Sequence, residues 1–181
     1  MLLSDLEYPT NKIIHNVLFH SGRGAGAEQY NFEKKTKKSN FKIMKRQRFS
    51  IKLYDKSLQF GLTIPLLKFE VKFHHMEDLK RNGKKLCLSD TTNIDVLKFL
   101  GSIVQKKWNE TFIYDWTIDK SKLNAHQKIK IKDYKNPNYR INLSENRNRN
   151  QFSKELNLYK KIVENNSKKV HQYIGEQIFK K

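Results

Sequence analysis

The sequence has little of what builds covalent scaffolds, membrane spans or export signals. Cys87 is its one cysteine, so neither an internal disulfide nor a cysteine metal cluster can form within the chain. Its apolar runs are all far shorter than a bilayer span requires. Residues 1–8 lack the basic and apolar regions of a signal peptide. We therefore expect a cytoplasmic protein without membrane contact.

Acidic residues are also scarce. The chain has 18 aspartates and glutamates against 37 lysines and arginines, which gives a formal charge of +19. Such an excess opposes compaction by self-repulsion, so a polyanionic partner is the economical explanation. An AT-rich genome, which favours lysine, asparagine and isoleucine codons, is an alternative source of the same composition.

Length and hydrophobic content indicate a folded chain with a modest core. Hydrophobic residues make up 37% of the 181 residues, which is too many for a disordered chain and few for a large core. The length suits one compact domain, or one domain with a helical appendage. Aromatic residues, at 12%, often lie beside lysine or arginine, a pattern that suits both nucleic-acid stacking and ordinary amphipathic strands.

Hydrophobic periodicity predicts an α+β fold, with a small antiparallel sheet packed by helices and a helical C-terminal part. We predict a sheet-containing domain over 1–118, and a basic linker with a helix pair over 119–181. The predicted strands cover 13–19, 49–56, 67–73 and 111–118, where the last is either a strand or an extended segment, and a glycine-rich loop is predicted at 21–26. The predicted helices cover 74–82, 93–108 with a capping box from Thr92 to Asp95, and two segments around 152–163 and 170–178.

The strands 49–56 and 67–73 are predicted to form a hairpin with one functional face. Side chains alternate between the two faces of a strand. If Ile51 and Phe69 face the core, the opposite face carries a tyrosine, lysines and a carboxylate, namely Tyr54, Lys56, Glu70 and Lys72. An exposed sheet face whose polar residues only meet water is the alternative interpretation.

This group of side chains has the parts for phosphodiester cleavage. A phenol titrates near pH 10, so neighbouring cations help it to ionise and attack phosphorus. Lysine can neutralise charge that develops on the phosphate oxygens. A carboxylate can help to hold a divalent ion that orients the phosphate.

Two short motifs on this hairpin resemble the signature of phage and plasmid rolling-circle replication initiators, in particular the filamentous-phage replication initiation proteins. One is the Tyr-x-Lys strand of 51–57, and the other is the Lys-Phe-Glu strand of 66–72. The stretches 114–118 and 134–139 are also similar to the family, and the resemblance covers roughly residues 13–163.

The resemblance implies a DNA nickase in which Tyr54 is the nucleophile, Lys56 assists it and Glu70 is the strand glutamate. From its charge and its facing we infer that Glu70 helps to hold Mg²⁺ or Mn²⁺. Members of the family take further metal ligands, commonly a histidine pair or an acidic equivalent, from an earlier, central strand. The resemblance also implies that the protein acts in a bacterial host cell. No His-hydrophobic-His triplet precedes Tyr54, and His15 and His20 would point to opposite faces of a regular strand. We therefore expect a C-terminal portion of an initiator or a shortened relative.

The expected partner is DNA, single-stranded or locally melted at an origin. Residues 34–56 contain ten basic side chains and one acidic one. A basic DNA-binding module without catalysis is the alternative function, and an RNA- or ribosome-associated protein is a third. The expected nucleic-acid contacts are the cations of this stretch and of the second hairpin strand: Lys34, Lys35, Lys37, Lys38, Lys45, Arg46, Arg48, Lys52, Lys68 and Lys72.

Overall fold

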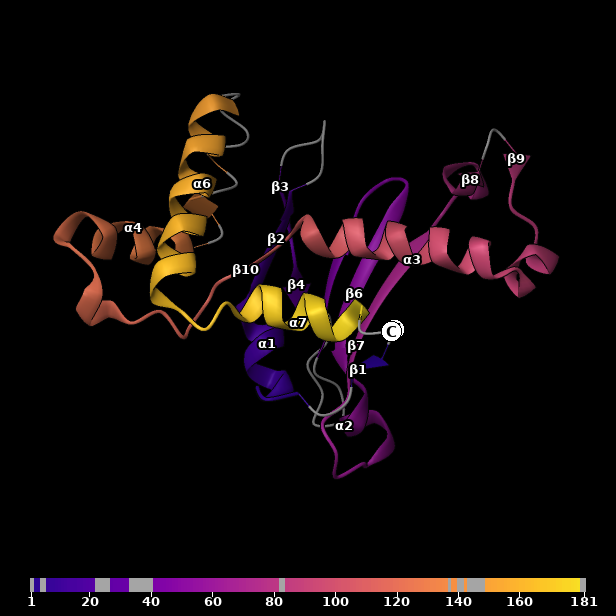
Figure 1. Cartoon of the computed structure of the whole chain (residues 1–181), viewed down its shortest axis with the longest axis horizontal. Helices are drawn as coiled ribbons and strands as arrows, with labels where there is room; N and C mark the ends of the chain where they lie inside the picture. Colours follow the sequence, from indigo (N-terminus) through magenta and orange to yellow (C-terminus); the bar gives the residue numbers. More distant parts are fainter. Residues whose placement is uncertain are drawn as a thin grey trace.

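The computed structural model has the predicted α+β class, with small antiparallel sheets and helices that include the C-terminal part (Figure 1). It describes residues 2–3, 6–21, 27–32, 41–81, 84–136, 138–139, 142 and 149–179. The helices that it describes are α1 (Thr10–Asn16), α2 (Lys56–Phe60), α3 (Ile94–Asn109), α4 (Ala125–Lys135), α6 (Arg149–Asn166) and α7 (Val170–Phe179).

The strands form a five-stranded sheet, a three-stranded sheet and a short hairpin. In the first sheet the strand order is β1-β7-β6-β5-β4, and every neighbouring pair is antiparallel. The order in the second is β10-β2-β3. The strands are β1 (Leu2–Leu3), β2 (Val17–Ser21), β3 (Ala27–Gln29), β4 (Asn31–Phe32), β5 (Phe41–Lys45), β6 (Phe49–Asp55), β7 (Leu67–Phe73), β8 (Lys80–Arg81), β9 (Lys84–Lys85) and β10 (Thr111–Ile113).

A single residue joins the two larger sheets. Tyr30 separates β3 from β4, and its backbone N–H donates to Leu18 O at 2.9 Å. Because β3 pairs with β2 and β4 pairs with β5, the segment 27–32 passes from one sheet to the other.

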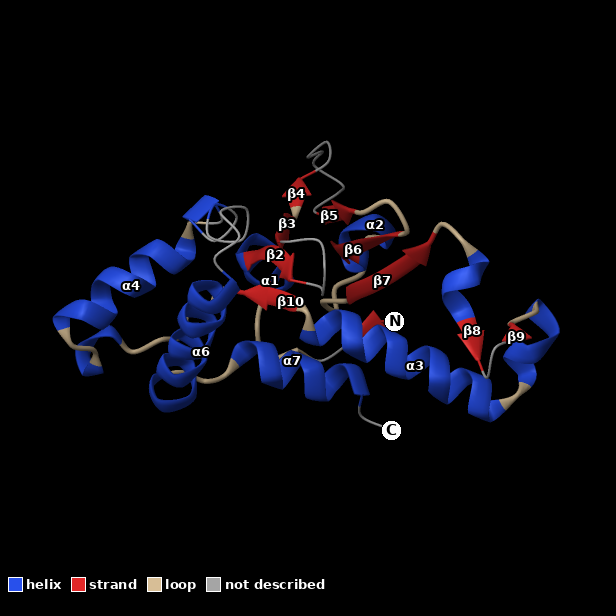
Figure 2. Cartoon of the chain, turned by 90° about the horizontal axis from the view of Figure 1, so that it is seen from above, coloured by secondary structure: helices blue, strands red, loops and turns tan. Residues whose placement is uncertain are grey.

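The predicted hairpin of β6 and β7 is confirmed, with seven residue pairs in register. The predicted inward residues Ile51, Leu53 and Phe69 are at most 1% exposed. They pack against α1, α3 and α7, and Figure 2 shows α3 and α7 together on one side of β7. Trp108 of α3 lies at the centre of this core, with its ring edge-on to Phe69 at 5.2 Å between centroids.

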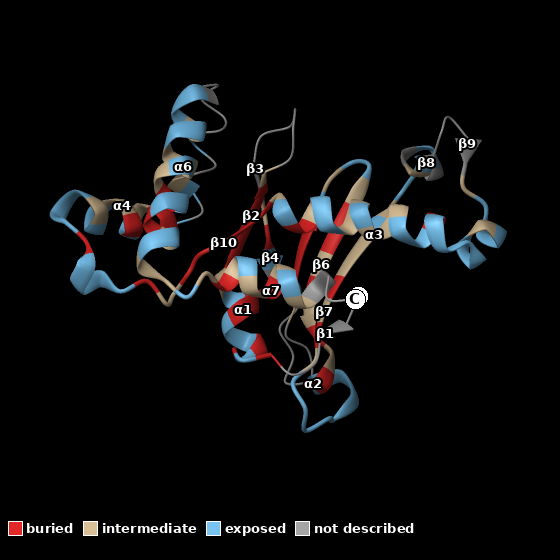
Figure 3. Ribbon diagram, in the orientation of Figure 1, coloured by how far each residue is buried: buried red, intermediate tan, exposed pale blue. Residues whose placement is uncertain are grey.

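A second core forms where α4 and α6 pack on β2 and β10. Phe19 and Phe112 stack at 4.6 Å, and Tyr159 of α6 packs against Phe112 at 4.7 Å between centroids. Tyr134 of α4 is fully buried in the same cluster. Val170 of α7 belongs to the first core, so residues on both sides of the predicted boundary at 118 and 119 share each cluster. Figure 3 shows buried positions in red on β2 and β10 and on the helices α4 and α6.

Several predicted elements differ from those observed. The apolar run 13–19 is not one strand, because α1 covers its first part and β2 its second. The predicted helix 74–82 is a 3₁₀ helix over Met76–Leu79 followed by β8. The N-cap of α3 is Asn93 rather than Thr92, since the Asn93 side chain accepts from Asp95 N–H at 2.8 Å. The loop 22–26 lies outside the described residues.

In the C-terminal part, one helix was missed and the two terminal helices are confirmed. The long basic stretch after residue 119 contains α4, which we did not predict. The two terminal helices are confirmed as α6 and α7, and α7 begins at Val170, whose backbone N–H donates to Asp115 Oδ2 at 3.0 Å. None of the helices described is both long and apolar enough to cross a bilayer.

Candidate nucleic-acid interface

The face of the five-stranded sheet that points away from the core carries the predicted site. Tyr54 pairs with Lys68 in the register, and Lys52 pairs with Glu70 in the next row. All four side chains are partly exposed, as expected for the outer side of a strand pair whose inner side is buried. Tyr54 and Glu70 therefore share a face, as the alternation predicts.

Tyr54, Glu70 and Lys68 form one hydrogen-bonded cluster on that face. The Tyr54 hydroxyl donates to Glu70 Oε2 at 3.2 Å, and Lys68 Nζ lies 2.8 Å from the same oxygen. Lys68 Nζ also lies 5.5 Å from the centre of the Tyr54 ring. The hydrogen bond from Lys68 lowers the pKa of Glu70, and the one to Glu70 raises the pKa of Lys68, so both groups are ionised at neutral pH.

Lys56 does not belong to this cluster, contrary to the prediction. Strand β6 ends at Asp55, whose side chain accepts from the Ser57 and Leu58 backbone N–H groups and caps α2. Lys56 therefore starts a helix, and its Nζ lies 5.0 Å from the centre of the Phe60 ring. Lys72 does lie on the outer face, where it pairs with Ser50.

A basic hollow adjoins the cluster on the same face. Lys52 comes from the row beside Tyr54, and Lys72 from the row beyond it. Four of the predicted nucleic-acid contacts line this hollow, and none of the described residues in its lining is a carboxylate. The lining consists of Ile43, Lys45, Arg46, Gln47, Ser50, Lys52, Lys72 and His74.

The turn between β5 and β6 shapes one end of this hollow. Arg46 Nη2 donates to His20 O of β2 at 3.4 Å, and the backbone N–H of Arg46 donates to Phe49 O at 2.8 Å. The His74 backbone N–H donates to Arg48 O at 2.9 Å, which ties the end of β7 to the turn. These hydrogen bonds, to β2 on one side and from β7 on the other, fix the turn and with it the backbones of Arg46 and Arg48.

The remaining predicted contacts lie elsewhere. Arg48 is exposed in the turn, beside the hollow but not among its lining residues. Lys34, Lys35, Lys37 and Lys38 lie outside the described residues. Gln47, Ser50 and His74 line the hollow and were not predicted as contacts.

One lysine of the basic stretch 34–56 is buried in the interior and does not lie on the outer face. Lys42 is 5% exposed, and its Nζ donates to His15 O at 2.8 Å and to Val17 O at 2.7 Å. Burial lowers the pKa of Lys42 to about 8. This ammonium group satisfies backbone carbonyls where α1 ends, so it does not contribute to the outer basic face.

The residues around Glu70 do not form a metal site as they stand. Glu70 Oε2 already accepts from Tyr54 and Lys68, and Lys52 is a further cation beside the carboxylate. Across the described part of the chain, no group of three or more His, Cys, Asp or Glu side chains is placed to hold an ion. The role of Glu70 in binding Mg²⁺ or Mn²⁺ stays a prediction. The two histidines of the early segment are also apart, since His15 is exposed on α1 and His20 is buried on β2.

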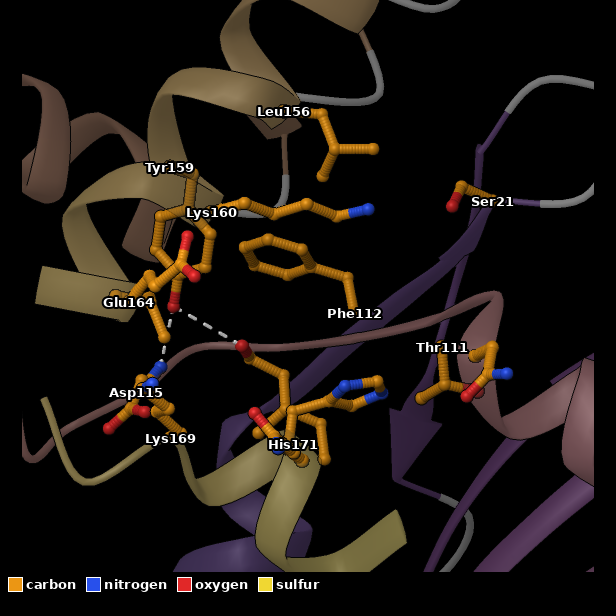
Figure 4. A pocket seen from close by; sticks show the side chains of 14 residues that line it. Ser21, Thr111, Phe112, Asp115, Leu156, Tyr159, Lys160, Glu164, Lys169 and His171 are labelled. Carbon is orange, nitrogen blue, oxygen red and sulfur yellow. Dashed lines mark hydrogen bonds between the residues drawn. The ribbon is translucent and has the colours of Figure 1, made fainter.

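A second cavity, of about 210 Å³ and lined by both basic and acidic side chains, lies between β10, α6 and α7 (Figure 4). Phe112 and Leu156 form apolar parts of its lining, and Lys160 and Glu164 come from α6. The Tyr159 hydroxyl donates to Ile113 O and accepts from the Asp115 backbone N–H, at 3.3 and 2.7 Å. These contacts are structural, and we find the stronger site in the basic hollow.

Comparisons with known proteins give no independent indication of function, so the function is inferred from the geometry of the site. No protein-family model, no curated protein and no solved structure matches this chain.

Proposed function

We propose that this chain binds nucleic acid, with single-stranded or locally melted DNA as its preferred form, on the outer face of the five-stranded sheet. The observation that carries the proposal is the hollow, which Lys45, Lys52 and Lys72 line together. Lysines placed in this way neutralise phosphates. The partly exposed Tyr54 ring on the same face offers a stacking surface for an unpaired base.

Removing the three lysines of the hollow tests this proposal. We expect the triple variant Lys45→Gln, Lys52→Gln, Lys72→Gln to bind a single-stranded oligonucleotide more weakly than wild type. Each lost phosphate contact lowers the slope of log K against log salt by about 0.7 for single strands, so the slope should fall by about two. Fluorescence anisotropy of a labelled oligonucleotide over a series of NaCl concentrations measures both quantities.

A matched triple variant separates local contacts from total charge. Lys128, Lys132 and Lys135 are exposed on α4, and replacing them with glutamine removes the same charge from another part of the chain. We expect this control to keep most of the slope. Equal losses in the two triples would show that binding is not located at the hollow, and salt-insensitive binding by wild type would exclude the phosphate contacts. The same titration with RNA tests the third function, which a clear preference for RNA would favour.

Cleavage of DNA by Tyr54 is a second candidate function, favoured by the contact of the Tyr54 hydroxyl with Glu70 and Lys68. In the proposed step the phenolic oxygen bonds to phosphorus while the bond from phosphorus to the 3′-oxygen breaks. Glu70 accepts the phenolic proton, and the departing 3′-oxygen takes a proton from Lys68. The products are a 5′-phosphotyrosine and a free 3′-hydroxyl, which can prime replication.

The Tyr54→Phe variant tests the chemical step. With labelled single-stranded and supercoiled DNA, in the presence and absence of Mg²⁺ or Mn²⁺, we expect a covalent adduct with wild type and none with the variant. Denaturing electrophoresis detects the adduct.

The control for this experiment is Tyr139→Phe. Tyr139 also lies beside a lysine, since its hydroxyl is 3.1 Å from Lys130 Nζ, and Lys130 in turn contacts Glu155. An adduct that survives in Tyr54→Phe, or is lost equally in Tyr139→Phe, would contradict the assignment of the nucleophile. Absence of any adduct beside salt-sensitive binding would leave only the first proposal.

A further inference from the structure

A small lobe beside the Tyr54 cluster presents large apolar side chains to solvent. The lobe comprises residues 56–66, that is α2 and the loop that leads to β7, and it lies at the bottom of Figure 1. Its exposed apolar residues are Leu58, Phe60, Leu62 and Ile64, at 44, 60, 50 and 57% exposure. Four such residues within seven positions form a patch that needs an explanation, whereas single exposed hydrophobic residues do not.

The backbone of the lobe is firmly held at its base. The Lys56 N–H donates to Leu66 O at 2.7 Å, which closes the lobe, and the Asp55 carboxylate caps α2. The helix ends at Gly61, which adopts a left-handed conformation with φ of 66°, and the Leu62 N–H then donates to Ser57 O at 2.9 Å. The apolar side chains therefore stand on an ordered support, and their exposure does not result from a loose loop.

The charges around the lobe select among possible partners. Residues 56–69 contain no carboxylate, and Lys56 lies over the Phe60 ring at 5.0 Å. Contact between two copies of this lobe would bring like charges together. The fitting partner offers both apolar faces and negative charge, which is the combination that unpaired bases and their phosphates provide.

The lobe is also continuous with the proposed binding face. Strand β6 ends and β7 begins at the lobe, so Tyr54 and Lys68 form the row of the outer face next to it. Lys72 lies four residues further along β7, about 13 Å away at the rise of 3.3 Å per residue. A strand of a few nucleotides held at the hollow would thus extend past Tyr54 to the base of the lobe that carries Phe60.

We propose that this lobe is an apolar wedge whose Phe60 and Leu62 side chains stack on, or insert between, bases of melted nucleic acid and keep them unpaired beside Tyr54. The inference rests on the proposed nucleic-acid binding and adds the form of ligand that is recognised. Apolar side chains inserted at base steps unstack nucleic acid in this way. Because the wedge contacts bases and not phosphates, it adds affinity for single strands without adding salt dependence.

The test compares Phe60→Ala and the double variant Phe60→Ala, Leu62→Ala with wild type. The probes are a single-stranded oligonucleotide that contains 2-aminopurine and a duplex of the same sequence. We expect Phe60→Ala to lower the affinity for the single strand about tenfold, within the range measured for stacking on aromatic residues, and the double variant to lower it further. The 2-aminopurine fluorescence change should be lost, while the salt slope and the affinity for duplex change little.

The control variant is Ile129→Ala, which removes an equally exposed apolar residue, at 63%, from α4. It should bind as wild type does. If wild type does not bind nucleic acid, the proposed function fails. If wild type binds and Phe60→Ala binds equally well with the same fluorescence change, the wedge alone is overturned. Binding to anionic phosphatidylglycerol vesicles, or self-association in sedimentation, that is lost with Phe60 while binding to DNA is unchanged would also overturn it.

Discussion

Replacing Asp115 with alanine is expected to lower the free energy of unfolding by about 3–5 kcal/mol, because a buried carboxylate with several partners is lost. Asp115 is 2% exposed and joins three segments of the chain. Its Oδ1 accepts from the Thr117 N–H at 2.9 Å and the Thr117 hydroxyl at 2.6 Å. Its Oδ2 accepts from the Ser167 hydroxyl at 2.9 Å and from the Val170 N–H at 3.0 Å.

The consequence extends beyond the four hydrogen bonds. Val170 opens α7 and is itself fully buried in the core that includes Trp108. Without the carboxylate, the first turn of α7 has an unsatisfied buried donor, and the helix is less firmly fixed to the sheet.

Thermal unfolding measures this effect, and a domain of this size should lose about 6–20 °C in Tm. Asp119→Ala is the matched control, because Asp119 makes the same kind of contact to the Ser121 N–H and hydroxyl but is exposed. We expect only a small change in Tm for that variant, and an intermediate one for Asp115→Asn. Equal shifts in the two alanine variants would contradict the role of Asp115 as a buried joint.

Local patterns predict the parts of the fold that alternate strictly. Ile51, Leu53 and Phe69 occupy every second position of their strands, so sequence alone places them inside and Tyr54 and Glu70 outside. The two terminal helices also show an apolar face at helical spacing. These signals are local, because each depends on one segment and its own period.

Elements are harder to predict where the sequence pattern fits a helix as well as a strand, or fits neither clearly. The run 13–19 is apolar throughout, which fits a buried strand as well as a buried helix, and the structure divides it between α1 and β2. Helix α4 is strongly basic, and only Ile131 and Tyr134 of its residues are buried. The end of β6 did have a local signal, since Asp55 followed by Ser57 suits an N-cap that stops the strand before Lys56.

The candidate site, too, could be predicted from the sequence only in part. Alternation brings Tyr54 and Glu70 together, but it cannot show that Lys68, and not Lys56, completes their cluster. The hollow depends on the β5–β6 turn, which Arg46 attaches to a carbonyl of β2 far away in the sequence. Contacts of this kind leave no periodic trace in a single sequence.

Acid is expected to destabilise wild type more steeply than a His20→Gln variant between about pH 6.5 and about pH 3. His20 is fully buried, and burial, with Arg46 and Lys107 nearby, lowers the pKa of its imidazole from 6.5 to about 3. Its Nε2 lies 3.3 Å from Glu110 Oε2, but the imidazole is neutral at pH 7, so this contact is not an ion pair there.

The direction follows from proton binding. Between these pH values the unfolded chain carries a proton on His20 and the folded chain does not, so unfolding takes up a proton. Stability falls as the pH falls, by at most about 1.4 kcal/mol per pH unit for one such group. Urea unfolding at a series of pH values should therefore show a shallower decline in His20→Gln.

His15→Gln is the control, because His15 is exposed on α1 and its replacement should leave the decline close to that of wild type. Parallel curves for wild type and His20→Gln would show that folding does not lower the pKa of His20. The outcome bears on the binding face, because the His20 carbonyl accepts the hydrogen bond from Arg46. Because the folded protein keeps His20 neutral down to about pH 3, we expect this hydrogen bond, and the turn that it holds at one end of the hollow, to persist until the chain unfolds.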